Sequence, residues 1–253
     1  MKNLFAFLLF LMLSANCMAQ VEKYGVYELT LRGAATPNPD IDLELTATFQ
    51  QGGKSYTPEG FYDGDGVYKV RFMPASVGEW TYVTHSNHPD LDNKTGGFTC
   101  IEGGNKGPVR VANVHHFAHA DGTRFYPFGT TVYEWAFRPE PSKLQTLETL
   151  KASPFNKVRM LAVPPYKPNY IDGPEKLTVF PFFGQSRADF DFSRFNPAYF
   201  RSLERDVKRL SDLGMQVDLI LFRPYDKGRG AGPELRGLWT ASSKSAGGGG
   251  DET

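Results

Sequence analysis

The sequence predicts an antiparallel β-sandwich followed by an α/β layer or barrel. Short apolar–polar alternations, separated by turns rich in Gly, Asp and Asn, fill residues 21–105. After residue 107, nearly continuous apolar runs alternate with amphipathic helical stripes, a pattern typical of parallel strands joined by helices. The 26 glycines and 18 prolines among 253 residues indicate many turns and argue against a helical bundle.

The strands of the first region are indicated by a period of two. Leu43 to Phe49 and Tyr68 to Phe72 alternate apolar and polar residues, so one face of each strand is expected in a core. Asp65-Gly66 lies between two such runs and is a pair favoured in hairpin turns. Trp80 marks a further strand, and Gly97 to Ile101 the last one. Strands at this spacing over about 85 residues predict an immunoglobulin-like sandwich of antiparallel sheets.

The second region follows the order β-α-β-α-β. In chain order, its expected strands and helices are residues 126–132, 142–152, 157–163, 196–214 and 217–222. Right-handed crossovers are expected between the parallel strands. The insert at 164–195 is dense in aromatic residues and prolines, and two interpretations of it remain open. Loops of this length are usually functional or disordered, and the aromatic density argues against disorder. The insert therefore either packs its own aromatic side chains together or faces a ligand.

The N-terminus predicts export. Leu4 to Leu13 is an apolar run of ten residues, too short for a membrane span of about 20 residues but suited to a signal peptide. Ala19 is the expected end of the signal, and Cys17 is disfavoured as a lipid anchor because Asn16 precedes it. We therefore expect a secreted or periplasmic monomer without an integral membrane span. Its folded part keeps one cysteine, Cys100, and so no internal disulfide.

Charge and motif counts exclude several classes of ligand. The 28 Lys and Arg balance 28 Asp and Glu, so no basic excess is available for nucleic acid. His115, His116 and His119 are closely spaced, but adjacent residues of a strand point to opposite faces, and no acidic ligand follows at a characteristic spacing. A hairpin is favoured over a metal site there. No metal or other cofactor is expected.

Segments spread along most of the chain carry a resemblance to one enzyme family, in the same order: residues 60–74, 78–82, 107–111, 121–131, 153–160, 190–197 and 218–226. They are similar to the apiosidase-like (β/α)8 glycoside hydrolases with their N-terminal β-sandwich domain. The resemblance implies a secreted protein that hydrolyses glycosidic bonds of polysaccharides, with carbohydrate as its partner. Together with the apolar N-terminus and the glycine-rich C-terminus, it gives the expected order of parts: signal peptide 1–19, β-sandwich 20–106, partial (β/α)8 barrel 107–227 and glycine-rich disordered tail 228–253.

The resemblance also implies where substrate binds. In barrels of this kind the site lies at the carboxyl ends of the strands. By that rule the expected substrate-binding residues are Tyr133, Glu134, Trp135, Arg159, Tyr166, Tyr225 and Asp226. Aromatic rings suit the C–H faces of sugars, and charged side chains suit their hydroxyls. Two alternatives stay open: Arg159 as an ion-pair partner inside the barrel, and Trp135 as a cap over its lower layers.

The sequence departs from the family pattern at two points. Arg223 stands where related barrels tend to carry His, and Arg offers donors without an acceptor. Glycoside hydrolysis also needs two carboxyl groups, which in related barrels come from later strands, often from an Asn-Glu pair. No Asn-Glu dipeptide follows Asp226. No catalytic residue is therefore assigned.

The end of the sequence explains these departures if the chain is C-terminally truncated. Residues 228–253 contain eight glycines and neither a strand run nor an amphipathic helix. About three barrel strands remain, whereas a complete barrel needs about 250 residues. We expect a poorly soluble, catalytically inactive N-terminal fragment of a glycoside hydrolase. The alternative function is that of a non-catalytic carbohydrate-binding or structural β-sandwich module.

Overall fold

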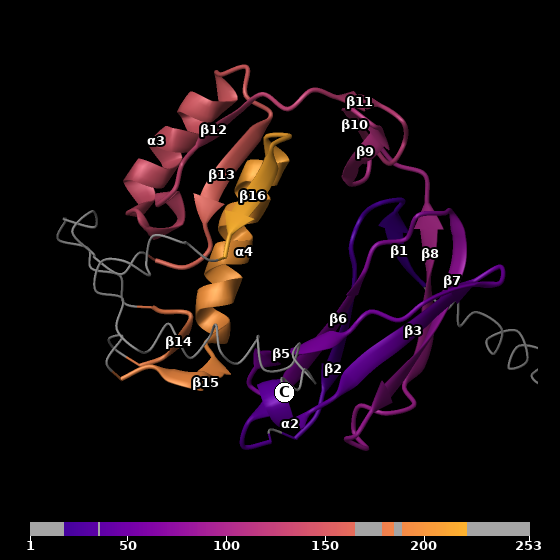
Figure 1. Cartoon of the computed structure of the whole chain (residues 1–253). Helices are drawn as coiled ribbons and strands as arrows, with labels where there is room; N and C mark the ends of the chain where they lie inside the picture. The colour runs from indigo at the N-terminus through magenta and orange to yellow at the C-terminus, as the bar shows by residue number, and fades with distance from the viewer. Residues whose placement is uncertain (1–17, 35, 165–178, 185–188, 222–253) are drawn as a thin grey trace, which may run out of the picture. The chain divides into compact units, whose positions relative to one another are not determined.

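The described part of the chain is mostly β, with several small sheets and few helices. The computed structural model describes residues 18–34, 36–164, 179–184 and 189–221 (Figure 1). Its contacts define two compact units, Met1–Tyr126 with Phe190–Pro197 and Pro127–Asp189 with Ala198–Thr253. The domain borders expected from the sequence, at residues 106 and 227, stay predictions.

The first unit contains two sheets with a common core. One sheet has five strands, in the order β1 (Ala19–Glu22), β8 (Thr95–Ile101), β7 (Gly78–Ser86), β3 (Leu45–Gln51) and β4 (Lys54–Tyr56). The other has the order β2 (Tyr27–Arg32), β6 (Val67–Phe72) and β5 (Gly60–Gly64). All neighbours are antiparallel except β1 and β8, which are parallel.

Aromatic side chains fill the space between these two sheets. The rings of Phe49 and Phe72 stack at 4.5 Å between centroids, and those of Tyr27 and Phe98 at 4.0 Å. Trp80, like Phe49 and Phe98, is fully buried. The expected alternation is confirmed in β3 and β6, where every second residue enters the core. Two mostly antiparallel sheets that close on one apolar layer agree with the period-two pattern.

The expected hairpin turn joins β5 to β6. Asp65 and Gly66 both adopt positive φ, 52° and 70°, the left-handed backbone that a two-residue hairpin turn requires. A Cβ atom at residue 66 would lie 2.9 Å from the carbonyl oxygen of Gly33. Glycine is therefore needed at this position both for its backbone angle and for the close approach of a neighbouring strand end.

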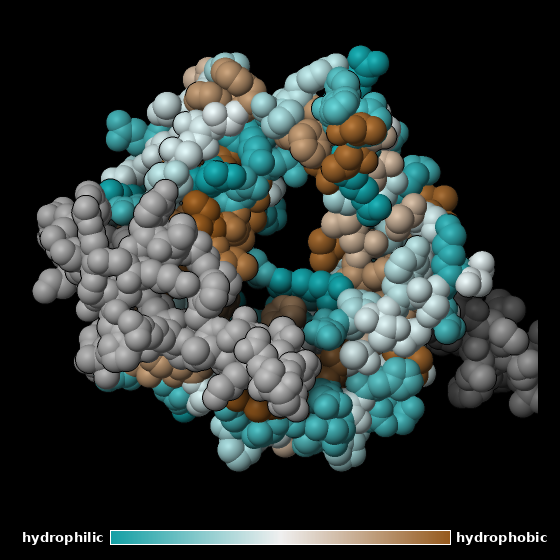
Figure 2. Space-filling view, in the orientation of Figure 1, coloured by the Kyte–Doolittle hydropathy of each residue, from teal (hydrophilic) through white to brown (hydrophobic). Residues whose placement is uncertain are grey.

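A third antiparallel sheet contains the clustered histidines. It consists of β9 (Val109–Asn113), β10 (His116–His119) and β11 (Arg124–Phe125), and its exposed apolar side chains contribute the brown surface near these strands in Figure 2. His116 Nδ1 lies 2.9 Å from Asn113 Oδ1, and His119 Nδ1 lies 3.0 Å from the carbonyl oxygen of Gly107. Across the described ranges, no three His, Cys, Asp or Glu side chains form a group that could hold a metal ion.

The second unit is built around a parallel sheet. Its three strands have the order β12 (Gly129–Thr131), β13 (Lys157–Leu161) and β16 (Gln216–Ile220). They alternate along the chain with η1 (Trp135–Phe137), α3 (Glu140–Lys151) and α4 (Pro197–Asp212), and the short strand β14 (Phe182–Phe183) precedes α4. The predicted β-α-β-α-β order is confirmed, whereas a barrel is not shown.

Helices α3 and α4 pack on one face of this sheet. Val158 and Met160 of β13 are buried with Leu150 of α3 and Leu210 of α4. Gly214, with φ of 78°, follows α4 as its expected stop. The expected stripe of α3 is only partly correct, because Leu144 is half exposed. Within the described ranges, no helix is long and apolar enough to cross a membrane.

The aromatic core of the first unit should dominate its stability. We expect Phe49→Ala to lower the free energy of unfolding by about 3–5 kcal/mol, because Phe49 is fully buried and its removal leaves a cavity. Phe61→Ala is the matched control, since that ring is 39% exposed. Urea unfolding followed by circular dichroism measures both. Equal losses for the two variants would contradict this assignment of the core.

Candidate functional site

Two of the predicted site residues follow β12 at the carboxyl end of the parallel sheet. The backbone N–H of Val132 donates to Arg159 O at 2.9 Å, and that of Leu161 donates to Tyr133 O at 2.8 Å. These bonds extend the pairing with β13 beyond the end of β12. Tyr133 is left with a side chain that is 50% exposed. Its ring is available to a ligand at this edge of the sheet.

Glu134 is held by a neighbouring cation. Its Oε2 lies 3.2 Å from Nη2 of Arg138, one helical turn further along the chain. The Glu134 side chain is 16% exposed, whereas that of Arg138 is 41% exposed. A partly buried carboxylate with one charged partner can still accept a bond from a ligand hydroxyl with its remaining lone pairs.

Trp135 lies in the core of the second unit. It is 3% exposed, and its Nε1–H donates to the carbonyl oxygen of Lys143 at 3.2 Å. Its neighbours in the core include Val158 and Met160 of β13. These contacts give Trp135 a role in packing, which is close to the alternative that it caps the layers beneath it. A role in binding substrate stays a prediction for this residue.

Arg159 is paired inside the sheet. Its Nε and Nη2 lie 3.3 and 3.0 Å from Oδ2 of Asp218, which is its register partner on β16. Lys157 Nζ reaches the same oxygen at 3.0 Å. The contacts of Arg159 are therefore those of an ion-pair partner, which was the alternative to substrate binding. The Arg159 side chain is nevertheless 54% exposed, so part of the guanidinium faces solvent.

These contacts set the charge state of Asp218. Burial raises its pKa, but the hydrogen bonds and charges of Lys157 and Arg159 outweigh burial and hold the pKa below its ordinary value. Two cations thus share one carboxylate oxygen of Asp218. Sequence reasoning missed Asp218, although an acidic residue within an apolar strand run was a usable signal.

The remaining predicted site residues lie outside the described ranges. These are Tyr166, Tyr225 and Asp226. The structure thus brings Tyr133 and Glu134 to one end of the parallel sheet, keeps Arg159 within it and buries Trp135.

A buried ion pair between the two helices was not anticipated. Lys143 Nζ of α3 lies 2.6 Å from Oδ2 of Asp206 of α4, and Asp206 is 2% exposed. At the rim, Arg209 pairs with Glu140 at 2.7 Å and holds the pKa of that carboxyl below its ordinary value. In the sequence, Lys143 stands beside the expected apolar stripe of the helix. A lysine at such a position is usually solvated, so the sequence alone does not indicate that it is buried.

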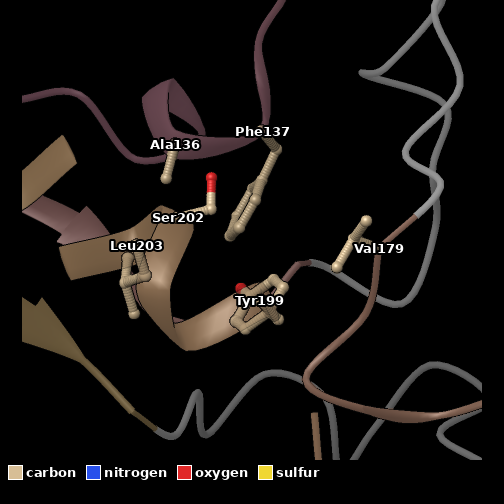
Figure 3. Close-up of a pocket in the computed structure, with 6 residues that line it drawn as sticks. All are labelled: Ala136, Phe137, Val179, Tyr199, Ser202 and Leu203. Carbon is tan, nitrogen blue, oxygen red and sulfur yellow. The ribbon is translucent and has the colours of Figure 1, made fainter. Parts of the chain in front are cut away.

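A small hollow lies between η1, α4 and residue 179 (Figure 3). Its lining residues are Ala136, Phe137, Val179, Tyr199, Ser202 and Leu203. Its volume is about 50 Å³, whereas small-molecule sites usually have about 300 Å³ or more. The hydroxyl of Tyr199 donates to Ala162 O at 2.5 Å, and burial raises the pKa of Tyr199 well above its usual range. This hydroxyl is a neutral structural donor just beyond the end of β13.

Comparisons with known proteins support a relation to glycoside hydrolases. Residues 20–87 match a domain of unknown function, DUF5060. A solved structure from Bacteroides vulgatus ATCC 8482, described provisionally as a glycoside hydrolase, is 41% identical and has a TM-score of 0.76 over 83% of this chain. This chain covers 43% of that protein. No curated protein shows a significant match.

Two further solved structures are similar at a much lower level. A GH5 xyloglucanase from Bacteroides ovatus, in complex with a XXXG heptasaccharide, is 12% identical with a TM-score of 0.24, over 80% of this chain and 43% of that one. A family 39 glycoside hydrolase from Bacteroides cellulosilyticus WH2 is 9% identical, also with a TM-score of 0.24, over 84% and 34%. Scores this low carry no argument about the site.

The buried ion pair should be essential to the second unit. We expect Asp206→Ala to cost about 3–5 kcal/mol of unfolding free energy, because it leaves the Lys143 ammonium buried without its partner. Replacing both residues, as Lys143→Met with Asp206→Leu, should recover most of that loss. Asp212→Ala on the same helix is the control, since its pair with Lys208 is exposed. Urea unfolding measures all four proteins, and a loss in the double variant as large as in Asp206→Ala would contradict the prediction.

The lowered pKa of Asp218 predicts a dependence of stability on pH. A carboxyl whose folded pKa lies below its unfolded value stabilises fully above the unfolded pKa, and this contribution is lost as the pH falls through the folded pKa. We therefore expect the difference in Tm between the natural chain and Asp218→Asn to be full at neutral pH and to shrink below about pH 4. Thermal unfolding across this range checks it. A difference independent of pH would refute the proposed charge pairing.

Proposed function

We propose that the chain is part of a secreted or periplasmic glycoside hydrolase that acts on the glycosidic bonds of a polysaccharide. The observation that carries this proposal is the likeness to the Bacteroides vulgatus protein, at 41% identity and a TM-score of 0.76. In this proposal residues 20–106 are an immunoglobulin-like sandwich and residues 107–227 belong to a (β/α)8 barrel. No catalytic carboxylate is assigned among the described residues, so the activity itself belongs to the proposal.

The geometry of the parallel sheet supports a binding edge for sugar. Parallel strands with helices on one face place ligands at their carboxyl ends, where Tyr133 and Glu134 lie. A half-exposed aromatic ring suits the C–H face of a pyranose or furanose ring. The partly buried carboxylate beside it suits a hydroxyl, since it accepts a charge-assisted hydrogen bond. We assign these two residues to substrate binding, and Tyr166, Tyr225 and Asp226 remain proposed partners.

A second candidate function is carbohydrate binding by the sandwich itself. Phe61 of β5 is exposed and lies 4.8 Å from the guanidinium of Arg71 on β6. The same face carries Lys69 between Glu28 and Asp63, at 2.8 and 3.1 Å. An aromatic ring surrounded by charged hydrogen-bonding groups is a surface on which a sugar ring can stack. This candidate requires no catalysis.

One binding experiment distinguishes the two candidates. Oligosaccharides from a panel of plant and microbial polysaccharides are titrated against the natural chain, Tyr133→Ala and Phe61→Ala by calorimetry. We expect Tyr133→Ala to weaken binding by about tenfold, because the ring supplies apolar contact, and Phe61→Ala to bind normally. The reverse result would favour the sandwich as the binding module. Failure of the natural chain to bind any member of the panel would refute carbohydrate as its partner.

A further inference from the structure

The hollow between η1 and α4 has the size of a substituent rather than of a whole ligand (Figure 3). Its volume is about 50 Å³, about a third of the roughly 150 Å³ of an apolar cavity that holds benzene. A sugar ring therefore does not fit, but a methyl group does. Among the lining residues Val179 is exposed, and Ala136, Ser202 and Leu203 are half-buried, so the hollow reaches the surface.

The lining favours an apolar guest over water. The Tyr199 hydroxyl donates to the carbonyl oxygen of Ala162 at 2.5 Å, and the Ser202 hydroxyl accepts Nη2 of Arg205 at 3.0 Å, so both hydroxyls of the lining have partners within the protein. The other lining side chains are apolar: Ala136, Phe137, Val179 and Leu203. A water molecule held in a cavity needs about two to four polar partners, whereas apolar cavities stay dry and accept apolar guests.

The hollow lies next to the candidate binding edge within the same unit. Tyr133 stands three residues before the lining residue Ala136, so their Cα atoms are at most about 11 Å apart. The backbone N–H of Leu161 donates to Tyr133 O at 2.8 Å, and the Leu161 side chain is buried in one cluster with Phe137 and Tyr199 of the lining. The end of β13 thus joins the backbone of Tyr133 to the wall of the hollow.

This lining distinguishes a methyl group from a hydroxymethyl group. A methyl group gains free energy when it leaves water for an apolar site. A hydroxymethyl group in the same place loses the hydrogen bonds of its hydroxyl to water, and a mostly apolar lining does not replace them. Differences of this kind in an apolar pocket change affinity by about tenfold or more.

We propose that the hollow is a subsite for the methyl group of a 6-deoxy sugar whose ring lies against Tyr133. The ring itself stays outside the hollow, where the partly buried carboxylate of Glu134 accepts hydrogen bonds from its hydroxyls. This inference rests on the proposed function, because it takes carbohydrate as the ligand. It narrows the substrate class from polysaccharides in general to glycans that carry 6-deoxy sugars.

Saturation-transfer NMR on the intact chain tests the subsite with two matched pairs of monosaccharides. L-Fucose differs from L-galactose only by a methyl in place of a hydroxymethyl group, and L-rhamnose differs from L-mannose in the same way. We expect each 6-deoxy sugar to bind about tenfold more tightly than its partner, with the strongest saturation at its methyl protons. Ala136→Leu fills the hollow and should remove this preference.

Three further variants separate the subsite from the fold. Ala152→Leu is the matched control, since it makes the same substitution at an exposed residue outside the lining. Val179→Phe narrows the hollow from an exposed position outside the helices and strands, so it keeps the test decisive if Ala136→Leu does not fold. Tyr133→Ala should weaken both members of each pair, because the ring contacts the part that the two sugars share.

The outcomes distinguish the subsite from the proposed function. Equal affinities within each pair in the natural chain would overturn the inference, and so would a preference that survives in both hollow-filling variants. If the natural chain binds the oligosaccharide panel in calorimetry but shows no preference for 6-deoxy sugars, the subsite is refuted and the proposed function stands. Failure to bind both the panel and the four monosaccharides would refute the proposed function together with the subsite.

Discussion

The alternation of β13 is the constraint on which the second unit depends. Val158 and Met160 enter the core beneath α3 and α4, so Lys157 and Arg159 must point to the opposite face. A shift of one residue in register would exchange the two sets and bury two cations under the helices. The pairing of Arg159 with Asp218 fixes the register of β16 against β13 with the same precision.

A cluster of polar contacts joins η1, α3 and α4. The Lys143 ammonium lies 2.6 Å from Oδ2 of Asp206. The backbone carbonyl oxygen of Lys143 accepts the indole N–H of Trp135 at 3.2 Å. Removing two charges from water is costly, and well-packed apolar residues often stabilise equally well. The value of the pair lies in its directionality, because an ion pair with one geometry restricts how α4 can rotate against α3. The bond from Trp135 to Lys143 also fixes the end of the segment that follows β12 and carries Tyr133 and Glu134.

Local patterns in the sequence predict many of the strands and helices but not their long-range partners. The alternation in β3 and β6, the Asp65-Gly66 turn and the β-α-β-α-β order all follow from interactions between residues close in sequence. Nothing local links Lys143 to Asp206, which are 63 residues apart, or Asn38 to Ser193, which are 155 apart. The site followed the same rule. The positions of Tyr133 and Glu134 follow from strand ends, whereas the burial of Trp135 depends on how α3 packs.

The charged face of the parallel sheet limits what can cover it. Lys157 and Arg159 share one carboxylate, so an apolar layer placed over them would bury a net positive charge at a high cost in solvation. Any stable cover must therefore supply oxygen acceptors, from further side chains, from water or from a ligand. Sugars offer such acceptors in their hydroxyl and ring oxygens, and Tyr133 offers an apolar surface at the neighbouring strand end. The charge of this face therefore makes it unsuitable for a purely apolar cover and compatible with a cover that accepts hydrogen bonds.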